Sequence, residues 1–363
     1  MQISTLFLLS VLGGCSTQVP TPSSNEEKDG GTTQDAPAVP PKSDTKREVL
    51  MKAVPADPLA GARKAPIVPI TNIHEHVWSM EELPKLITGM DNMGIERTVV
   101  LGSPLHTFAL GQTSFTHYDE NNDRVLGMAT LEPDRIIPFV VLNPNDADAV
   151  EKLRAYAARG ARGVKLFAGH GSNHGLGPYH TMRLDDKRLH AIYSAIEELG
   201  LPVLFHVNYS KYSEEFDNAM SAHPKMRVLC PHFCLSLRNT TKVDELLARY
   251  PNLWMDTSIG WIKFQAEGYR RIDVKPDVVK AIIQKYPDRF LYGTDLVITS
   301  SDAKSAEWVT MNMGFYRDVL ERESYSYYGL SGGPLTGLAL SEDILTRVYR
   351  DNATAWPDGS PQP

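Results

Sequence analysis

Eight short apolar runs that resemble β-strands alternate with helix-like stretches, and this alternation limits the fold more than any other feature of the sequence. Most runs are almost continuous in β-branched or aromatic residues, as expected for parallel strands that are covered on both faces. Eight strand and helix units of this size predict an α/β fold, the TIM (β/α)8 barrel. The predicted strands are residues 67–77, 97–102, 137–142, 162–167, 202–207, 227–233, 253–258 and 290–295.

Side chains that can bind metal ions stand at the carboxyl ends of five of these strands. Because alternate residues of a strand share a face, His74 and His76 point to one side of the first strand and Glu75 to the other. Two adjacent imidazoles form half of a zinc-type site. Each residue alone has a structural explanation as a satisfied core group, but their repeated place at strand ends predicts a metal site. The candidates are His74, His76, Lys165, His206, His232 and Asp295.

The positions of these candidates also distinguish between two folds. A doubly wound open sheet has the same alternation, but no glycine-rich phosphate loop follows an early strand. His74 and Asp295 belong to the first and last strands, which only barrel closure makes neighbours. The helices between the strands have recognisable ends: Ser79 and Glu82 have the spacing of a capping box, and Gly200 stands where a helix should end. These features favour the barrel.

The ordered ligand set resembles that of the amidohydrolase superfamily, and more narrowly its amidohydrolase-related (amidohydrolase 2) branch. The resemblance covers about residues 68–357, and shorter strings such as Tyr-Gly-Thr-Asp at 292–295 and Asn-Ala at 352–353 agree with it. This branch contains both hydrolases and nonoxidative decarboxylases. The metal-binding residues that the resemblance implies are His74, His76, His206 and Asp295.

The same resemblance implies a role for each polar side chain. The four ligands would hold a divalent ion, with zinc expected and manganese as the alternative, and would leave a position where water is acidified. Asp295 would accept a proton from that water, and His232 would stabilise an oxyanion or protonate a leaving group. Lys165 has two interpretations: a carboxylated lysine that bridges to a second ion, or an amine that pairs with Asp256 or a substrate carboxylate.

The first residues predict a lipoprotein signal. Residues 3–12 are an apolar run that is too short to span a bilayer. Leu-Gly-Gly-Cys at 12–15 resembles the bacterial lipobox, which makes Cys15 the lipidation site at the end of a signal peptide, residues 1–15. The segment before the apolar run lacks Lys and Arg, so an ordinary secretory signal is the alternative.

The rest of the domain organisation follows from composition. Residues 16–60 lack aromatic side chains and predict a disordered tether, because they cannot bury enough apolar surface to order themselves. The barrel then spans 61–357, and a short tail covers 358–363. A lipid anchor and a tether would hold the enzyme at a membrane of the bacterial cell envelope, facing the periplasm or the surface, with the anchor as its only membrane contact.

The overall charge limits the kinds of partner. The formal net charge is -7, and the absence of a basic excess argues against nucleic acid as the main partner. With 42% hydrophobic residues the chain can bury a substantial core, as a soluble enzyme with a small-molecule substrate requires. An oligomer is compatible with the sequence, which does not define the state.

Two cysteines flank one of the candidate site residues. If Cys230, His232 and Cys234 all lay in an extended strand, the two cysteine Cα atoms would be about 13 Å apart, too far for a disulfide. A tight turn after Phe233 would be needed to join them. We therefore expect Cys230 to lie in the core and Cys234 to be a thiol beside the pocket.

Together these features predict a lipid-tethered, metal-dependent hydrolase that acts on a carbonyl, ester, lactone or amide bond of a small molecule through a metal-activated water. Two alternatives stay open. A nonoxidative decarboxylase would use the same ligands to polarise a carboxylated substrate, and it would release carbon dioxide without adding water. A noncatalytic binding lipoprotein would do neither, but it would not require every ligand position to be filled.

Overall fold

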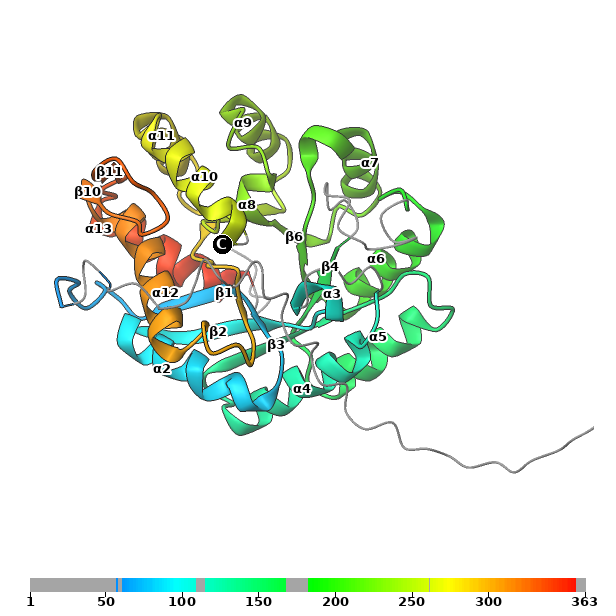
Figure 1. Cartoon of the computed structure of the whole chain (residues 1–363). Coiled ribbons are helices and arrows are strands. Elements are labelled where there is room, and N and C mark those ends of the chain that lie inside the picture. Colours follow the sequence, from blue (N-terminus) through cyan, green and yellow to red (C-terminus); the bar gives the residue numbers. More distant parts are fainter. Residues whose placement is uncertain (1–56, 58–60, 109–114, 168–181, 261, 357–363) are drawn as a thin grey trace, which may run out of the picture. The chain divides into compact units, whose positions relative to one another are not determined.

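A parallel sheet surrounded by helices forms the centre of the molecule (Figure 1). The computed structural model describes residues 57, 61–108, 115–167, 182–260 and 262–356, which all belong to the unit Pro40–Pro363. The strands of the sheet are β1 (Ile70–Val77), β2 (Ile95–Leu101), β3 (Ile136–Val141), β4 (Gly163–Leu166), β5 (Pro202–Phe205), β6 (Arg227–Cys230), β7 (Leu253–Asp256), β8 (Phe290–Leu291) and β9 (Leu296–Ile298). A separate antiparallel pair consists of β10 (Ser324–Tyr325) and β11 (Leu335–Thr336).

Helices connect successive strands and cover the outside of the sheet, as the sequence predicts. None of the helices in the described ranges is long and apolar enough to cross a bilayer. Their bounds are η2 (Met80–Glu82), α2 (Leu83–Met93), α3 (Leu105–Phe108), α4 (Tyr118–Leu131), α5 (Ala149–Ala158), α6 (Lys187–Leu199), α7 (Tyr209–Ala222), α8 (Pro231–Cys234), α9 (Thr240–Arg249), α10 (Ile262–Asp273), α11 (Pro276–Lys285), α12 (Ala306–Glu321), α13 (Glu342–Thr346), η4 (Arg347–Asp351) and α14 (Asn352–Ala355).

The sheet closes through a last strand that is interrupted. The order of the strands is β8-β7-β6-β5-β4-β3-β2-β1-β9, and only residues 292–295 separate β8 from β9 along the chain. Across this gap Ile73 N donates to Tyr292 O at 2.9 Å, and Asp295 N donates to His74 O at 2.8 Å. β8 and β9 are therefore two parts of the eighth strand of a TIM barrel, and the predicted continuous strand at 290–295 was wrong in its detail.

An apolar cluster fills the inside of the barrel, and the C-terminal helices close the end at which the strands begin. Trp356 is fully buried, and its ring centroid lies 5.6 Å from that of Phe139. The Trp356 indole donates to the carbonyl of Arg227, the first residue of β6, so this ring covers the amino ends of the strands. The cluster consists of Ile73, Val99, Leu101, Ile137, Phe139, Leu204, Leu229, Trp254, Leu291, Ala353 and Trp356.

A bulge in β1 turns the histidine pair toward the inside of the barrel. The register of β1 against β2 shifts between Asn72, opposite Thr98, and Glu75, opposite Val100, so β1 has one extra residue there. Ile73 belongs to the interior cluster, and the bulge allows His74, the next residue, to face the interior as well. The predicted alternation of His74 and His76 against Glu75 holds after the bulge.

The helix ends match the sequence signals. Ser79 N donates to Glu82 Oε2 at 3.0 Å in the expected capping box, and Gly200 ends α6 with a φ of 61°.

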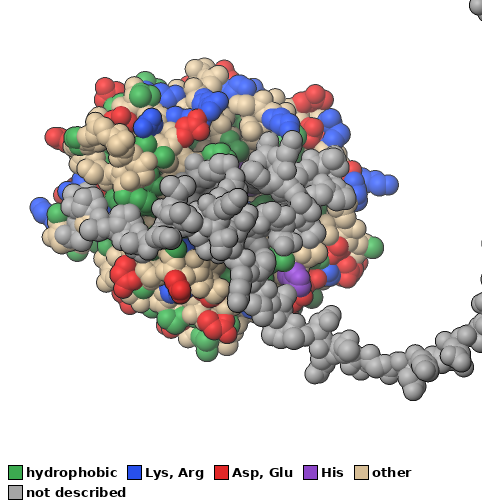
Figure 2. Space-filling model, viewed as in Figure 1, with side chains coloured by type: hydrophobic (Ala, Val, Ile, Leu, Met, Phe, Trp, Pro, Cys, Tyr) green, Lys and Arg blue, Asp and Glu red, His purple; other side chains and the backbone are tan. Residues whose placement is uncertain are grey.

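At the start of the described fold, Arg63 pairs with Asp318 of α12 at 2.7 Å. The predicted signal peptide, Cys15, nearly all of the tether and the tail lie outside the described residues. On the face in Figure 2, acidic and basic side chains are interspersed.

The segment after β6 differs from its prediction. The strand ends at Cys230 instead of 233, and His232, Phe233, Cys234 and Leu235 all have φ between 54° and 58°. This left-handed turn brings the Cα atoms of Cys230 and Cys234 to 4.9 Å, and the two residues form a disulfide. Cys230 is a core residue as expected, but the prediction of a free Cys234 thiol was wrong because it assumed that the strand continued.

Candidate metal centre

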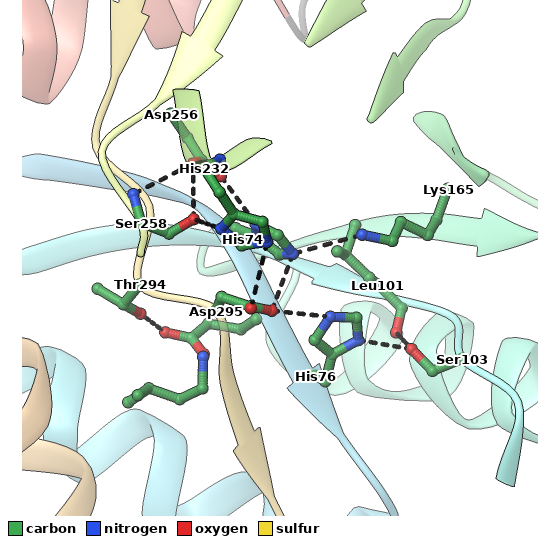
Figure 3. A network of polar contacts seen from close by, with 12 residues as sticks. His74, His76, Leu101, Ser103, Lys165, His232, Asp256, Ser258, Thr294 and Asp295 are labelled. Carbon is green, nitrogen blue, oxygen red and sulfur yellow. Dashed lines mark hydrogen bonds and ion pairs between the residues drawn. The ribbon is translucent and has the colours of Figure 1, made fainter. Parts of the chain in front are cut away.

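Three imidazoles at the carboxyl end of the barrel face one carboxylate (Figure 3). The Asp295 carboxylate lies 3.0 Å from His74 Nε2, 3.2 Å from His76 Nε2 and 3.5 Å from His232 Nε2. Ligand atoms around a tetrahedral zinc ion, at bond lengths of about 2.0 Å, are separated by about 3.3 Å. His74, His76 and Asp295 thus form a close group of possible ligands, and this buried His and Asp cluster is consistent with a small divalent ion.

Hydrogen bonds on the side away from the centre hold His74 and His232 each in the tautomer that has its proton on Nδ1. His74 Nδ1 lies 2.7 Å from Asp256 Oδ2, and an ionised carboxylate can only accept, so His74 Nδ1 carries the proton. His232 Nδ1 lies 2.7 Å from Ser258 Oγ, which itself donates to Asp256 Oδ1 at 2.6 Å. Since the serine proton is used in that bond, His232 Nδ1 must donate. The Nε2 lone pairs of both rings are therefore directed at the centre.

His76 obeys the same rule through a different partner. Its Nδ1 lies 2.6 Å from Ser103 Oγ, and Ser103 Oγ donates to Leu101 O at 3.0 Å. Ser103 consequently accepts from His76 Nδ1, which leaves the third Nε2 lone pair facing inward. A neutral imidazole with its outer nitrogen held by a polar partner is the usual form of a metal-binding histidine.

Asp256 organises the outer layer of the centre. It is fully buried at the end of β7 and accepts from four donors: His74 Nδ1, Ser258 Oγ, and the backbone N–H groups of His232 and Ser258 at 2.8 and 3.1 Å. Burial raises the pKa of Asp256, but the bond from His74 and the charge of that ring outweigh it, so the pKa lies below its usual range. Asp256 stays ionised.

The charge states of the inner groups differ. Burial lowers the pKa of His76 to about 4 and also lowers the pKa of His232, so both rings are neutral. Burial also lowers the pKa of His74, but the Asp295 carboxylate outweighs it and the net pKa is raised. The pKa of Asp295 lies well below its usual range, because the attraction of His74 and the bond from it exceed the burial effect.

Lys165 and His206 lie at the edge of this cluster. Lys165 is 1% exposed, with Nζ 3.4 Å from His74 Nε2, and burial lowers its pKa to about 8. No ion pair within 4 Å joins Lys165 to Asp256, so the predicted pairing of these two residues is not formed. His206 follows β5, and its ring centroid lies 5.1 Å from that of His232. It belongs to neither of the two close groups of possible ligands, which are His74, His232 and Asp256, and His74, His76 and Asp295.

The sequence analysis missed the outer partners Ser103, Asp256 and Ser258. Asp256 was named only as a partner for Lys165, although it ends the seventh strand and so meets the same positional rule as the other candidates. The two serines follow the second and seventh strands, and no feature of their local sequence separates them from other polar loop residues. All six predicted residues belong to the carboxyl end of the barrel, and the structure brings His74, His76, His232 and Asp295 into direct contact.

Known proteins share this fold. Solved structures that resemble it include a TIM-barrel protein from Bordetella bronchiseptica (16% identity, 81% of this chain and 99% of that chain, TM-score 0.54). Another is 2,6-dihydroxybenzoate decarboxylase complexed with 2,6-dihydroxybenzoate (16% identity, 80% and 100%, TM-score 0.52). A third comes from Pseudomonas putida and is assigned provisionally as 2-pyrone-4,6-dicarboxylic acid hydrolase (15% identity, 81% and 99%, TM-score 0.53). Similarity at this level of identity establishes the common fold.

The comparison with family models is more specific. No curated protein matches the sequence. The amidohydrolase 2 model, described as Amidohydrolase, matches residues 101–356, which include the barrel strands from β3 to β9. The buried ligand cluster at the strand ends agrees with that match. The chain therefore belongs to the amidohydrolase 2 family of metal-dependent enzymes.

Proposed function

We propose that the protein is a metal-dependent hydrolase that cleaves a carbonyl, ester, lactone or amide bond of a small molecule. The observation that carries this proposal is the common tautomer of three buried imidazoles, whose Nε2 lone pairs face the Asp295 carboxylate. The proposed ligands are His74, His76 and Asp295, together with His206, which follows β5. Three nitrogen donors and one carboxylate favour zinc, with manganese as the alternative.

The residues around the ligands supply what hydrolysis needs. A bound divalent ion would supply the Lewis acidity that activates water and polarises the scissile carbonyl. Asp295, which is held ionised, can accept the proton of the attacking water. His232 is connected through Ser258 to Asp256, and this chain holds its ring in place and stabilises it when it takes up a proton. His232 can then protonate the leaving group.

Lys165 supports a second candidate function, nonoxidative decarboxylation. Its buried amine lies beside the ligands and could hold a substrate carboxylate there. A decarboxylase of the same fold acts on 2,6-dihydroxybenzoate, a small aromatic acid. If Lys165 is instead carboxylated, it would add an oxygen ligand and allow a second ion, which favours hydrolysis. The number of bound ions therefore bears on the choice.

Metal content and product analysis test the proposal. We expect about one divalent ion per purified barrel domain, lost in the His74→Ala, His76→Ala double variant, while His190→Ala, outside the centre, retains it. About two ions would point to carboxylated Lys165. Release of acid from a panel of esters and lactones would support hydrolysis, and release of carbon dioxide from aromatic acids would support the decarboxylase. A domain that takes up no ion after reconstitution would overturn both.

We also propose that Cys15 is lipidated and anchors the enzyme in the cell envelope. The support is the Leu-Gly-Gly-Cys string at 12–15 and the polar segment that follows it. In a bacterial host, the full chain should fractionate with membranes and incorporate labelled palmitate. The Cys15→Ala variant should lose the label and leave the membrane fraction. An unlabelled, released full chain would contradict the anchor but not the enzyme.

A further inference from the structure

Glu75 stands between the two metal-binding histidines of β1 but points away from them. Its carboxylate is fully buried on the opposite side of the strand and is bonded to the eighth barrel strand, more than 200 residues away in the chain. Leu296 N donates to Glu75 Oε2 at 2.8 Å. Thr294 Oγ1 and Asn72 Nδ2, the latter at 2.7 Å, donate to Glu75 Oε1. These bonds have no role in the chemistry proposed for the centre.

The two residues that Glu75 holds on the eighth strand are the immediate neighbours of Asp295. Asp295 has a φ of 53°, a left-handed conformation that costs energy for any residue other than glycine and persists only where the surroundings enforce it. Figure 3 shows Thr294 beside Asp295 at this break in the strand. Asp295 N also donates to His74 O at 2.8 Å. The backbone of Asp295 is thus fixed by bonds to two successive residues of β1.

We infer that Glu75 is a positioning residue that fixes the left-handed backbone of Asp295 by bonding both of its neighbours, and so orients the Asp295 carboxylate toward the metal. Because Glu75 lies between His74 and His76, one segment of β1 carries two ligands and sets the conformation of a third. The inference rests on the proposed function insofar as it assigns Asp295 to a metal. The clamp itself, defined as Glu75, Asn72, Thr294 and Leu296, can be tested without one.

Hydrogen exchange in the metal-free domain tests the clamp directly. Glu75→Met removes every acceptor at similar volume, and exchange of amides in residues 292–298 should become roughly ten- to a hundredfold faster. Glu75→Gln retains one carbonyl oxygen that can accept from Leu296 N, so it should keep most of the protection. A residue that only fills space would give the same result for both variants. Glu82→Met, which removes another buried glutamate, should leave residues 292–298 unchanged.

Metal binding gives the second readout. In chelator competition, Glu75→Met should bind zinc or cobalt roughly ten- to a hundredfold more weakly, with a changed visible spectrum of the cobalt form, and Glu75→Gln should lie near the unmodified protein. If Glu75→Met does not fold, the isosteric Thr294→Val variant carries both measurements. Unchanged exchange in Glu75→Met, or equal effects of Met and Gln, would overturn the inference. An unmodified protein that takes up no metal would overturn the proposed function, while the exchange data would still decide the clamp.

Discussion

At the scale of single residues, His74 is the imidazole at which protons compete most strongly with a metal. Burial lowers its pKa, but Asp295 and Asp256 on its two ring nitrogens more than compensate, so the net pKa is raised, whereas those of His76 and His232 are lowered. Below its raised pKa, the ring of His74 is protonated on both nitrogens and cannot bind an ion. Metal binding must therefore release one proton from His74 at acidic pH.

This competition predicts that the metal affinity falls on acidification. The fall should begin above the ordinary histidine pKa of about 6.5 and approach about one logarithmic unit in Kd per pH unit. Chelator competition at a series of pH values measures it. His223→Gln, which removes a histidine bonded to His190 outside the centre, should give the same profile. An affinity that is constant from about pH 7 to 5 would contradict the raised pKa of His74.

The sequence identified site residues only where they follow the repeating pattern of strands. His74, His76, His232 and Asp295 were found because strand ends in a barrel meet at one edge, so their positions in the chain were enough. Their spacing around a common point could not be predicted, because it depends on the bulge in β1 and the left-handed conformation of Asp295. Asp256 and the two serines needed the hydrogen-bond network, which links residues from four separate strand ends.

At the scale of elements, the turn after β6 shows why the predicted strand limits failed. Four successive residues other than glycine have positive φ, which local propensity disfavours at each position. The disulfide joins Cys230, which precedes these residues, to Cys234, the third of them, and His232 lies between the two cysteines. The disulfide limits the turn to conformations in which its ends meet. It therefore contributes to the position of His232 in the metal centre.

We predict that the Cys230→Ala, Cys234→Ala double variant is less stable by roughly 2 kcal/mol, the chain-entropy contribution of so short a disulfide loop. Urea unfolding of the metal-free barrel domain measures the difference. The unmodified domain with its disulfide reduced by dithiothreitol should unfold at a similar urea concentration to the double variant. Identical midpoints for oxidised and reduced protein would show that the turn is stable without the bond.

At the scale of the whole molecule, the two ends of the barrel have separate tasks. The candidate metal-binding side chains occupy the carboxyl ends of the strands, and Trp356 with its apolar neighbours closes the amino ends. The sequence predicted the barrel because eight strand and helix units repeat along the chain. It did not predict that Trp356 closes the amino ends of the strands, since a single tryptophan near the C-terminus has no periodic context.

The position of Trp356 gives a prediction that separates the stability of the fold from metal binding. Trp356→Ala should lower the free energy of unfolding by about 3 to 5 kcal/mol, because it leaves a large cavity against Phe139. The metal affinity of the fraction that remains folded should be nearly unchanged, because the centre lies at the other end of the barrel. Denaturant unfolding and chelator competition measure the two quantities. Leu131→Ala, at a 66% exposed position, serves as the control and should change neither.

The late position of the last strand in the sequence also determines when the proposed metal centre can form during synthesis. His74 and His76 leave the ribosome early, but Asp295 and the β9 residues that pair with β1 are made after more than 200 further residues. A nascent chain therefore exposes two imidazoles without their carboxylate for most of its translation. A divalent ion bound by all of the proposed ligands would therefore enter a barrel that is already closed or closing, and it would stabilise only the finished fold.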